Sequence, residues 1–420
     1  MSRPLDVLMV TDTSPPATGG GAERVLWEHA TRLCARGHGV RVLARAPEVP
    51  RPYRGEASLS ITHFPVDRRS PLAFVRTAVL GARAAGERLV RERRPDALHA
   101  YQPLAGYGVL RAAAARGVPA LYTFLSPAPS EYRSRRGMTG LHRRGVAGAA
   151  TVAGLWLLEW SCLRRATLVH VLSDFSARQL RRLYGIPAAR IAKIPGGADT
   201  ERFRPAPDRA AARAALGLRP RTPLLLTVRN LEARMGLDRL LEAMARVRYF
   251  HPQAHLVVAG TGSRAGELRA QASALGVEDT VDFVGFVDDA RLAVYYQAAD
   301  AFVLPTRELE GFGLVTVEAL ACGTPVLGTP VGATPEILAP LEPSLLFKSA
   351  SAEAIADGLD RFLRALAADP GGATALRGAC HRYAESRYDW ERAVTSLERA
   401  LETVAGGGAG LLTRAGEASA

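Results

Sequence analysis

The sequence predicts an α/β protein built from two Rossmann-like, doubly wound domains. Its 420 residues exceed what one hydrophobic core usually organises, so two domains of roughly 200 residues each are expected. In both halves, short apolar runs typical of buried parallel strands alternate with helical patterns. A stretch rich in proline and glycine separates the two series, and neither a helix nor a strand would tolerate it.

The first domain is expected over residues 1–198, with a linker over 199–221. Its strand candidates are residues 5–10, 40–44, 61–64, 97–100, 120–124, 168–172 and 191–194. The first of these strands leads into Gly19, Gly20 and Gly21 and then a helical stretch. Such a strand, loop and helix lets the backbone approach a phosphate or an acceptor closely.

The second domain is expected over residues 222–387, where the alternation restarts. Its strand candidates are residues 224–228, 255–259, 281–284, 301–304 and 325–328. An amphipathic helix over 388–404 is expected to pack back on the first domain. Residues 405–420 are small, polar and rich in glycine, which favours a flexible tail.

The composition is that of a globular protein, with 48% hydrophobic and 23% charged residues. The net charge of +13 comes almost entirely from arginine, because Lys193 and Lys348 are the only lysines. Nucleotide phosphates, an anionic membrane or nucleic acid would suit this charge. A genome that favours arginine and alanine codons explains it equally well, so charge alone selects no function.

The sequence favours a cytoplasmic location. The four cysteines have no paired spacing that suggests a metal site or a redox motif, and they are expected as buried thiols in a reducing compartment. Residues 1–10 run directly into a strand pattern without the features of a signal peptide. The apolar run over 145–160 is shorter than the ~20 residues that a membrane-spanning helix needs.

The strongest candidate site is the loop after the strand at 301–304. Gly311 and Gly313 lie just before a helix, where successive backbone amides suit a diphosphate. Glu318, about one turn inside that helix, could accept both ribose hydroxyls, and Glu310 could accept hydroxyls of a sugar. Alternatively, the two carboxylates cap and solvate an ordinary helix.

Arg229 and Arg234 follow the first strand of the second domain. Two guanidinium groups beside a helix start are suited to neutralising a diphosphate leaving group. They could equally be solvated loop residues in a chain so rich in arginine. Gly260, Gly262 and Gly266 come close to a dinucleotide fingerprint but have one residue too many before the last glycine.

Several of these segments have a specific order and spacing. Glu310 and Glu318 are separated by seven residues, and the motif continues through 322–326 and 331–336. Ser173 with Asp174, the run over 194–199 and the opening glycines belong to the same pattern. Over roughly residues 5–404, the chain resembles the retaining glycosyltransferases of the GT-B fold, specifically glycosyltransferase family 4.

The resemblance implies two domains that face each other across a cleft and a nucleotide-diphosphate sugar, UDP- or GDP-linked, as donor. The implied acceptor is a hydroxyl of a glycan, a lipid-linked molecule or a small molecule, with retention of the anomeric configuration. No cofactor and no metal is implied, since arginines and helix amides stabilise the leaving charge.

The resemblance also assigns residues. Glu310, Arg229 and Arg234 are the implied catalytic residues. The implied donor-binding residues are Gly20, Gly21, Gly285, Phe286, Gly311, Phe312, Gly313, Leu314 and Glu318, with the base near Gly285 and Phe286.

Two positions depart from the family pattern. Met235 follows Arg234 where the family usually has a lysine, so Arg234 is expected to substitute. Leu125 stands where similar proteins often place a histidine that faces the sugar and acceptor. His99 is a candidate neighbour on the acceptor side, or else a buried structural histidine. A catalytically weak or inactive sugar-nucleotide-binding protein is therefore the alternative.

Other functions have less support in the sequence. A nicotinamide-dependent oxidoreductase would need a regular glycine fingerprint followed by an acidic residue, and a nucleic-acid-binding protein would need a recognised module. Peripheral contact with an anionic membrane is a further hypothesis. It rests on arginines 133, 135, 136, 143 and 144, followed by apolar residues at 155–158 and Trp160. The alternative is that these apolar residues belong to the core.

Overall fold

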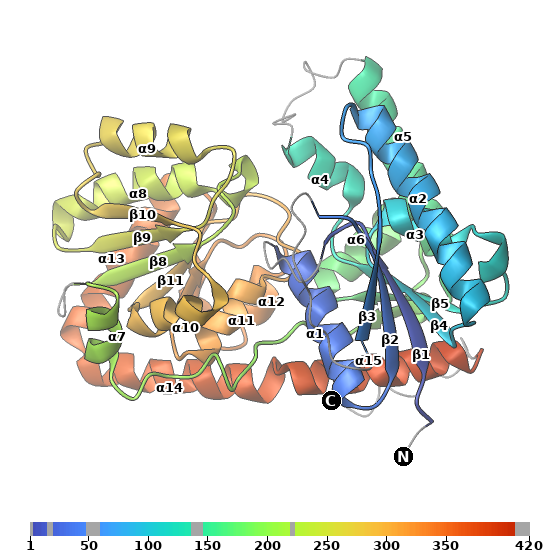
Figure 1. Ribbon diagram of the computed structural model, residues 1–420. Coiled ribbons are helices and arrows are strands. Elements are labelled where there is room, and N and C mark those ends of the chain that lie inside the picture. The colour runs from blue at the N-terminus through green and yellow to red at the C-terminus, as the bar shows by residue number, and fades with distance from the viewer. Residues whose placement is uncertain (1–2, 15–19, 48–58, 136–145, 219–222, 408–420) are drawn as a thin grey trace. The chain divides into compact units, whose positions relative to one another are not determined.

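The computed structural model describes residues 3–14, 20–47, 59–135, 146–218 and 223–407 (Figure 1). Gly19, arginines 136, 143 and 144, part of the expected linker and the end of the expected tail lie outside these residues. The chain divides into two compact units. The first comprises residues 1–195 together with 391–420, and the second comprises 196–390. The two-domain α/β fold class is thus confirmed.

The first unit contains a seven-stranded parallel sheet in the order β3-β2-β1-β4-β5-β6-β7. Its strands are β1 (Asp6–Thr11), β2 (Gly39–Arg45), β3 (Leu59–Phe64), β4 (Ala97–Ala100), β5 (Ala120–Phe124), β6 (Leu168–Val171) and β7 (Ile191–Lys193). Every residue of β1, β4, β5 and β6 is buried, as expected for a sheet covered on both faces.

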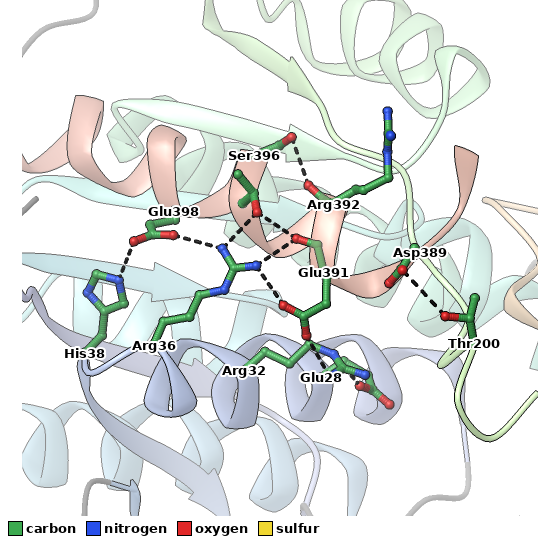
Figure 2. Close-up of polar contacts among 11 residues, drawn as sticks. Glu28, Arg32, Arg36, His38, Thr200, Asp389, Glu391, Arg392, Ser396 and Glu398 are labelled. Carbon is green, nitrogen blue, oxygen red and sulfur yellow. Dashed lines mark hydrogen bonds and ion pairs between the residues drawn. The ribbon is translucent and has the colours of Figure 1, made fainter. Parts of the chain in front are cut away.

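The helices of the first unit include one from the far end of the chain. They are α1 (Gly21–Ala35), α2 (Pro71–Glu92), α3 (Pro103–Leu110), α4 (Ala128–Arg135), α5 (Val146–Arg165), α6 (Asp174–Tyr184) and α15 (Trp390–Ala405). Figure 2 shows how α15 is joined to α1: Arg36 donates to the carboxylates of Glu391 at 2.8 Å and Glu398 at 3.0 Å. His38 shares Glu398, with 3.0 Å between Nε2 and Oε1.

The second unit contains a five-stranded parallel sheet in the order β10-β9-β8-β11-β12. Its strands are β8 (Leu224–Val228), β9 (His255–Ala259), β10 (Val281–Gly285), β11 (Ala301–Leu304) and β12 (Val326–Gly328). The order runs outward from β8 in both directions, so the crevice between β8 and β11 is the switch point at which doubly wound sheets bind ligands.

The helices of the second unit are α7 (Arg209–Ala215), α8 (Leu237–Phe250), α9 (Ala265–Ala274), α10 (Asp289–Ala298), α11 (Leu314–Ala321), α12 (Thr334–Leu338), α13 (Ala352–Ala368) and α14 (Pro370–Arg387). The sequence predicts a linker over 199–221, whereas the described residues of that range up to 218 belong to this unit and include α7. Asp208 caps α7 by accepting from the amide of Ala210 at 2.8 Å.

Helix ends follow from local chemistry. The Ser173 hydroxyl accepts from the amide of Ser176 at the start of α6, and Gly185, with φ of +66°, ends that helix in the left-handed conformation. Ser351 caps α13 in the same way.

Among the described residues, no helix offers an apolar stretch of the length that crossing a membrane requires. All four cysteines are buried free thiols, as predicted.

Candidate functional site

A buried ion pair lies at the switch point of the second unit. Arg229 directly follows β8 and Glu310 follows β11, its neighbour in the sheet. The Arg229 Nη2 atom lies 2.8 Å from Glu310 Oε2, and the two residues are only 8% and 7% exposed. Thr306 joins them, since its hydroxyl accepts from Arg229 at 3.0 Å and donates to Glu310 at 2.8 Å. Arg229 and Glu310, which the sequence analysis treats separately, thus form one ion pair.

The loops after β8 and β11 are joined through their backbones. The amide of Arg307 donates to the carbonyl of Arg234 at 2.8 Å, and Arg234 Nη1 donates to the carbonyl of Leu309 at 3.1 Å. Gly236, with φ of +75°, permits this approach, because a Cβ there would lie 1.8 Å from the Pro305 carbonyl oxygen. Arg234 therefore lies beside the loop after β11, which carries Glu310.

Leu309 has a φ of +60°, and among the described residues it is the only non-glycine residue with positive φ. Such a conformation costs on the order of 1–3 kcal/mol and persists only where the surroundings impose it. Here the loop is held by Arg234 on one side and by the carbonyl of Glu310 on the other, which accepts from the amide of Ala333 at 2.9 Å. The backbone of the loop between β11 and α11 is thus held in place by these hydrogen bonds.

The predicted glycine turn does start a helix. Gly313, with φ of +89°, is the N-cap of α11, so the backbone reverses just before the first helical amides. The Thr316 hydroxyl in the first turn is buried and has no hydrogen-bond partner among the described residues. Gly332 lies against this loop, and a Cβ there would lie 2.1 Å from the Glu310 carbonyl oxygen. The start of a helix together with an unpartnered hydroxyl suits a bound anion, because the first amides of a helix lack partners within the helix.

Glu318 lies on the same helix and is 2% exposed. Its Oε2 atom accepts from the Tyr296 hydroxyl at 3.1 Å, and Tyr296 comes from α10 and is itself fully buried. This contact orients the carboxylate. Sequence reasoning missed Tyr296 and Thr306, since neither belongs to a local motif, and only the packing of α10 and β11 around α11 brings them to the site.

Gly285 and Phe286, where the base is expected, lie at the end of β10. Gly285 has φ of +73°, and its carbonyl accepts from the amide of Gly260 at 2.7 Å, which joins this end to the end of β9. The Phe286 side chain is 62% exposed. An exposed ring at the carboxyl edge of the sheet offers a stacking surface.

The remaining predicted residues lie in the first unit. Gly20 is the N-cap of α1, and Gly21 is its first residue. Leu125 directly follows β5 and is half-buried.

His99, the other candidate on the acceptor side, lies within β4 and does not reach the surface. It is fully buried, with Nε2 at 2.7 Å from the Thr123 hydroxyl and Nδ1 at 3.3 Å from the Tyr101 hydroxyl. Thr123 continues the chain to His170 at 3.0 Å. Burial lowers the pKa of His99 well below its usual value, so the ring is a neutral structural group. This is the alternative that the sequence left open.

The apolar stretch of α5 is divided between core and surface. Leu155, Trp156 and Leu158 pack against the core of the first unit, whereas Leu157 and Trp160 are 56% and 37% exposed. Glu159 points inward, where its carboxyl accepts from the Tyr184 hydroxyl, from the amide of Ala128 at 3.0 Å and from the Tyr122 hydroxyl at 3.4 Å. Burial raises its pKa to about 8.

The candidate site of the second unit consists of arginines, a helix start and carboxylates. In the part of the chain that the structure describes, no three His, Cys, Asp or Glu side chains form a group that could hold a metal ion. The sheet order defines a doubly wound α/β protein, and the buried arginine and the helix start form a candidate anion site at the carboxyl edge of its sheet.

Comparison with known proteins identifies the family. The model of glycosyl transferases group 1 matches residues 208–369, and that of glycosyltransferase family 4 matches residues 19–202. A D-inositol 3-phosphate glycosyltransferase of Actinosynnema mirum is 31% identical over 92% of this chain and 94% of its own length. The chain belongs to glycosyltransferase family 4 and is a glycosyltransferase of the GT-B fold, as the sequence motifs suggested.

Two further similarities extend over nearly the whole chain. A GDP-mannose-dependent alpha-(1-6)-phosphatidylinositol monomannoside mannosyltransferase of Mycobacterium tuberculosis is 29% identical over 94% of this chain and 97% of its own length. Among solved structures, sucrose-phosphate synthase from Thermosynechococcus elongatus has a TM-score of 0.81 at 24% identity and covers 96% of this chain and 100% of its own. The latter supports the fold alone.

Proposed function

We propose that this glycosyltransferase moves a sugar from a UDP- or GDP-linked donor to an acceptor hydroxyl with retention of configuration. The observation that carries the proposal is the buried Arg229–Glu310 pair, 2.8 Å apart, beside the glycine turn that starts α11. A guanidinium with so little exposure loses little to solvent screening, so it can stabilise the charge that develops on a leaving diphosphate.

Each group has a distinct role in this proposal. The amides of 311–314 and the two arginines hold the diphosphate, Glu318 accepts the ribose hydroxyls, and Glu310 accepts a hydroxyl of the transferred sugar. The bond between the anomeric carbon and the phosphate oxygen breaks, while the acceptor oxygen bonds to that carbon on the same face. The leaving phosphate oxygen takes the acceptor proton. No metal enters this scheme, so transfer should persist in EDTA.

The names of the relatives guide the choice of acceptor. One acts on D-inositol 3-phosphate and another on a phosphatidylinositol monomannoside. An acceptor that carries inositol is therefore the first to test, ahead of other glycans and small molecules.

A nucleotide-binding protein without turnover is the second candidate. Met235 occupies the expected lysine position, is buried, and places its sulfur 2.7 Å from Arg229 Nη2, so the loop holds one cation fewer than the family pattern. Leu125 supplies no proton donor where similar proteins often have histidine. These two positions are specific reasons to measure turnover and not only binding.

The experiment is a thermal-shift screen of UDP- and GDP-sugars, followed by transfer assays with the stabilising donor and inositol acceptors. Stabilisation together with sugar transfer, and an α-linked product from an α-linked donor, supports the proposal. Stabilisation with neither transfer nor donor hydrolysis supports the binding protein. If no nucleotide sugar stabilises the protein, both proposals fail.

We also propose that the enzyme is cytoplasmic and contacts anionic membrane through α5. Leu157 and Trp160 are exposed on this helix, and the Arg164 guanidinium lies 5.7 Å from the centre of the Trp160 ring. Exposed apolar side chains beside a cation suit the surface of an anionic bilayer. Flotation with anionic liposomes at low salt should recover the wild type and Leu80→Ser, a control at another exposed leucine, but little of Leu157→Ser/Trp160→Ser. Equal recovery of all three proteins contradicts this contact.

A further inference from the structure

The second unit contains a cavity of about 510 Å³ at the edge of its sheet opposite the candidate donor site. Asp300 immediately precedes β11 and Pro325 immediately precedes β12, so the cavity lies at the amino ends of these strands. Its volume is within the range of small-molecule sites. The proposed transfer reaction does not use this cavity.

Three arginines and three carboxylates line the cavity: Arg209, Arg361 and Arg377, with Asp300, Glu342 and Asp369. Asp300 is 9% exposed and pairs with Arg209 at 2.6 Å and with Arg213 at 2.7 Å. Arg377, which also lines the floor, donates to neutral partners, the carbonyl of Ala299 at 2.9 Å among them. The Asp300 carboxylate is thus shared by two guanidinium groups, and Arg377 has no carboxylate partner among the described residues. Burial, with a further contribution from Arg209, lowers the pKa of Arg377 to about 10, the shift expected for a cation short of anionic partners.

The acidic groups at the rim already have amide partners. Glu342 accepts from the amide of Ser344 at 3.1 Å, and Asp369 accepts from the amide of Gly372 at 2.8 Å. In contrast, Arg209 Nε is buried and has no hydrogen-bond partner within the described residues. An orphan buried donor is costly unless a ligand or water satisfies it.

Apart from these charged groups, Ser344 and Thr374, the cavity wall is apolar. It is formed chiefly by Pro325, Leu345, Phe362, Ala365, Leu366 and Leu376. A free inorganic ion would leave this wall in contact with water, whereas a molecule with an apolar body would cover it.

We propose that this cavity is a second binding site, for a small organic anion that has a phosphate or carboxylate head and an apolar body. The head lies against Arg209 and Arg377, and the body lies along the wall formed by α13 and α14.

The floor is connected to the candidate donor site by hydrogen bonds. Arg377 Nη2 donates to the Thr324 hydroxyl at 3.4 Å, and that hydroxyl donates to the carbonyl of Tyr296 at 2.6 Å. The hydroxyl of the same tyrosine donates to Glu318. An anion that draws Arg377 toward the cavity releases the first of these bonds and thereby shifts the group that orients Glu318. This consequence, unlike the site itself, rests on the proposed function, and the coupling must be reciprocal.

The test uses phenyl phosphate, sodium benzoate and the neutral benzyl alcohol as probes of the full-length protein, by calorimetry up to about 10 mM. Ala365→Trp fills the cavity from an exposed position of α13, and Ala367→Trp adds the same bulk to the same helix outside the cavity lining. We expect at least one anionic probe to bind wild type and Ala367→Trp equally and Ala365→Trp about tenfold more weakly or not at all. Benzyl alcohol should not bind.

Competition for the donor site is excluded with a third variant. Arg234→Ala should leave anion binding unchanged, because Arg234 belongs to the proposed diphosphate site and lies outside the cavity lining. The proposal is overturned if neither anion binds the wild type, if Ala365→Trp binds as well as Ala367→Trp, or if benzyl alcohol binds as well as the anions. The effect of the bound probe on UDP affinity is then measured in the two tryptophan variants. A change in Ala367→Trp alone supports the coupling, and no change in either removes the coupling but not the site.

Discussion

Replacing Arg229 by methionine removes one charge of a buried pair and keeps most of the side-chain volume. Glu310 then remains 7% exposed without its cation, and the Thr306 hydroxyl loses a donor. Breaking a buried ion pair in this way costs about 3–5 kcal/mol of folding free energy, because the remaining carboxylate is uncompensated. Removing a charge-stabilising donor from the reacting centre costs about 10²–10³-fold in kcat.

The double variant Arg229→Met/Glu310→Gln separates these two effects. It leaves no unpaired buried charge, so stability should recover most of the loss, whereas kcat should stay low. We measure urea unfolding and initial rates of sugar transfer. The proteins compared are the wild type, both single variants and the double variant. If the double variant regains activity along with stability, or if Arg229→Met is as stable and active as the wild type, the assigned role of the pair is wrong.

Three further predictions concern other groups of the structure. Glu318→Ala should weaken nucleotide-sugar binding, measured by calorimetry, by about 1.5–3 kcal/mol. Tyr296→Phe removes only the hydroxyl that orients Glu318 and should weaken binding by about 0.5–1.5 kcal/mol. Equal affinities of both variants and the wild type would contradict the ribose contact. Arg234→Ala should lower kcat by more than it raises KM, because the charge on the leaving diphosphate is larger in the transition state than in the bound donor. A change in KM alone would assign Arg234 to ground-state binding.

The third of these concerns pH. The pKa of Glu159 is about 8 in the folded protein and 4.5 in the unfolded chain. Between these pH values the folded state binds one proton more than the unfolded state. The free energy of unfolding therefore falls as pH rises, by up to about 1.4 kcal/mol per pH unit. Melting temperatures from pH 5 to 8 should therefore fall less steeply for Glu159→Gln than for the wild type and the exposed control Glu385→Gln, and parallel curves would refute the assignment.

The sequence predicted both sheets because buried strands of a doubly wound fold are local apolar runs. Helix α14 was not predicted, since Pro370, Gly371 and Gly372 at its start are residues that favour a loop. In the structure Asp369 caps these residues, and the helix continues to Arg387. Helix α7, within the expected linker, was not predicted either, because that helix is held by Arg209 and Arg213 reaching Asp300, about 90 residues away in the chain.

The candidate site was predictable in its residue types but not in its contacts. Glu310 and Arg229 each follow an apolar run, and only the adjacency of β8 and β11 in the sheet makes them a pair. Tyr296 and Thr306 carry no local signal, because their roles come from tertiary packing. His99 lies within β4, whereas Arg229 follows β8, and the His99 side chain is buried in the hydrogen-bonded chain of the first unit.

The most direct measurement is a crystal structure of the protein with a bound nucleoside diphosphate. The account predicts the diphosphate against the amides of 311–314 and the Arg229 guanidinium, with the ribose hydroxyls on the Glu318 carboxylate. A nucleotide found at another place on the second unit, with this pocket empty, would contradict it.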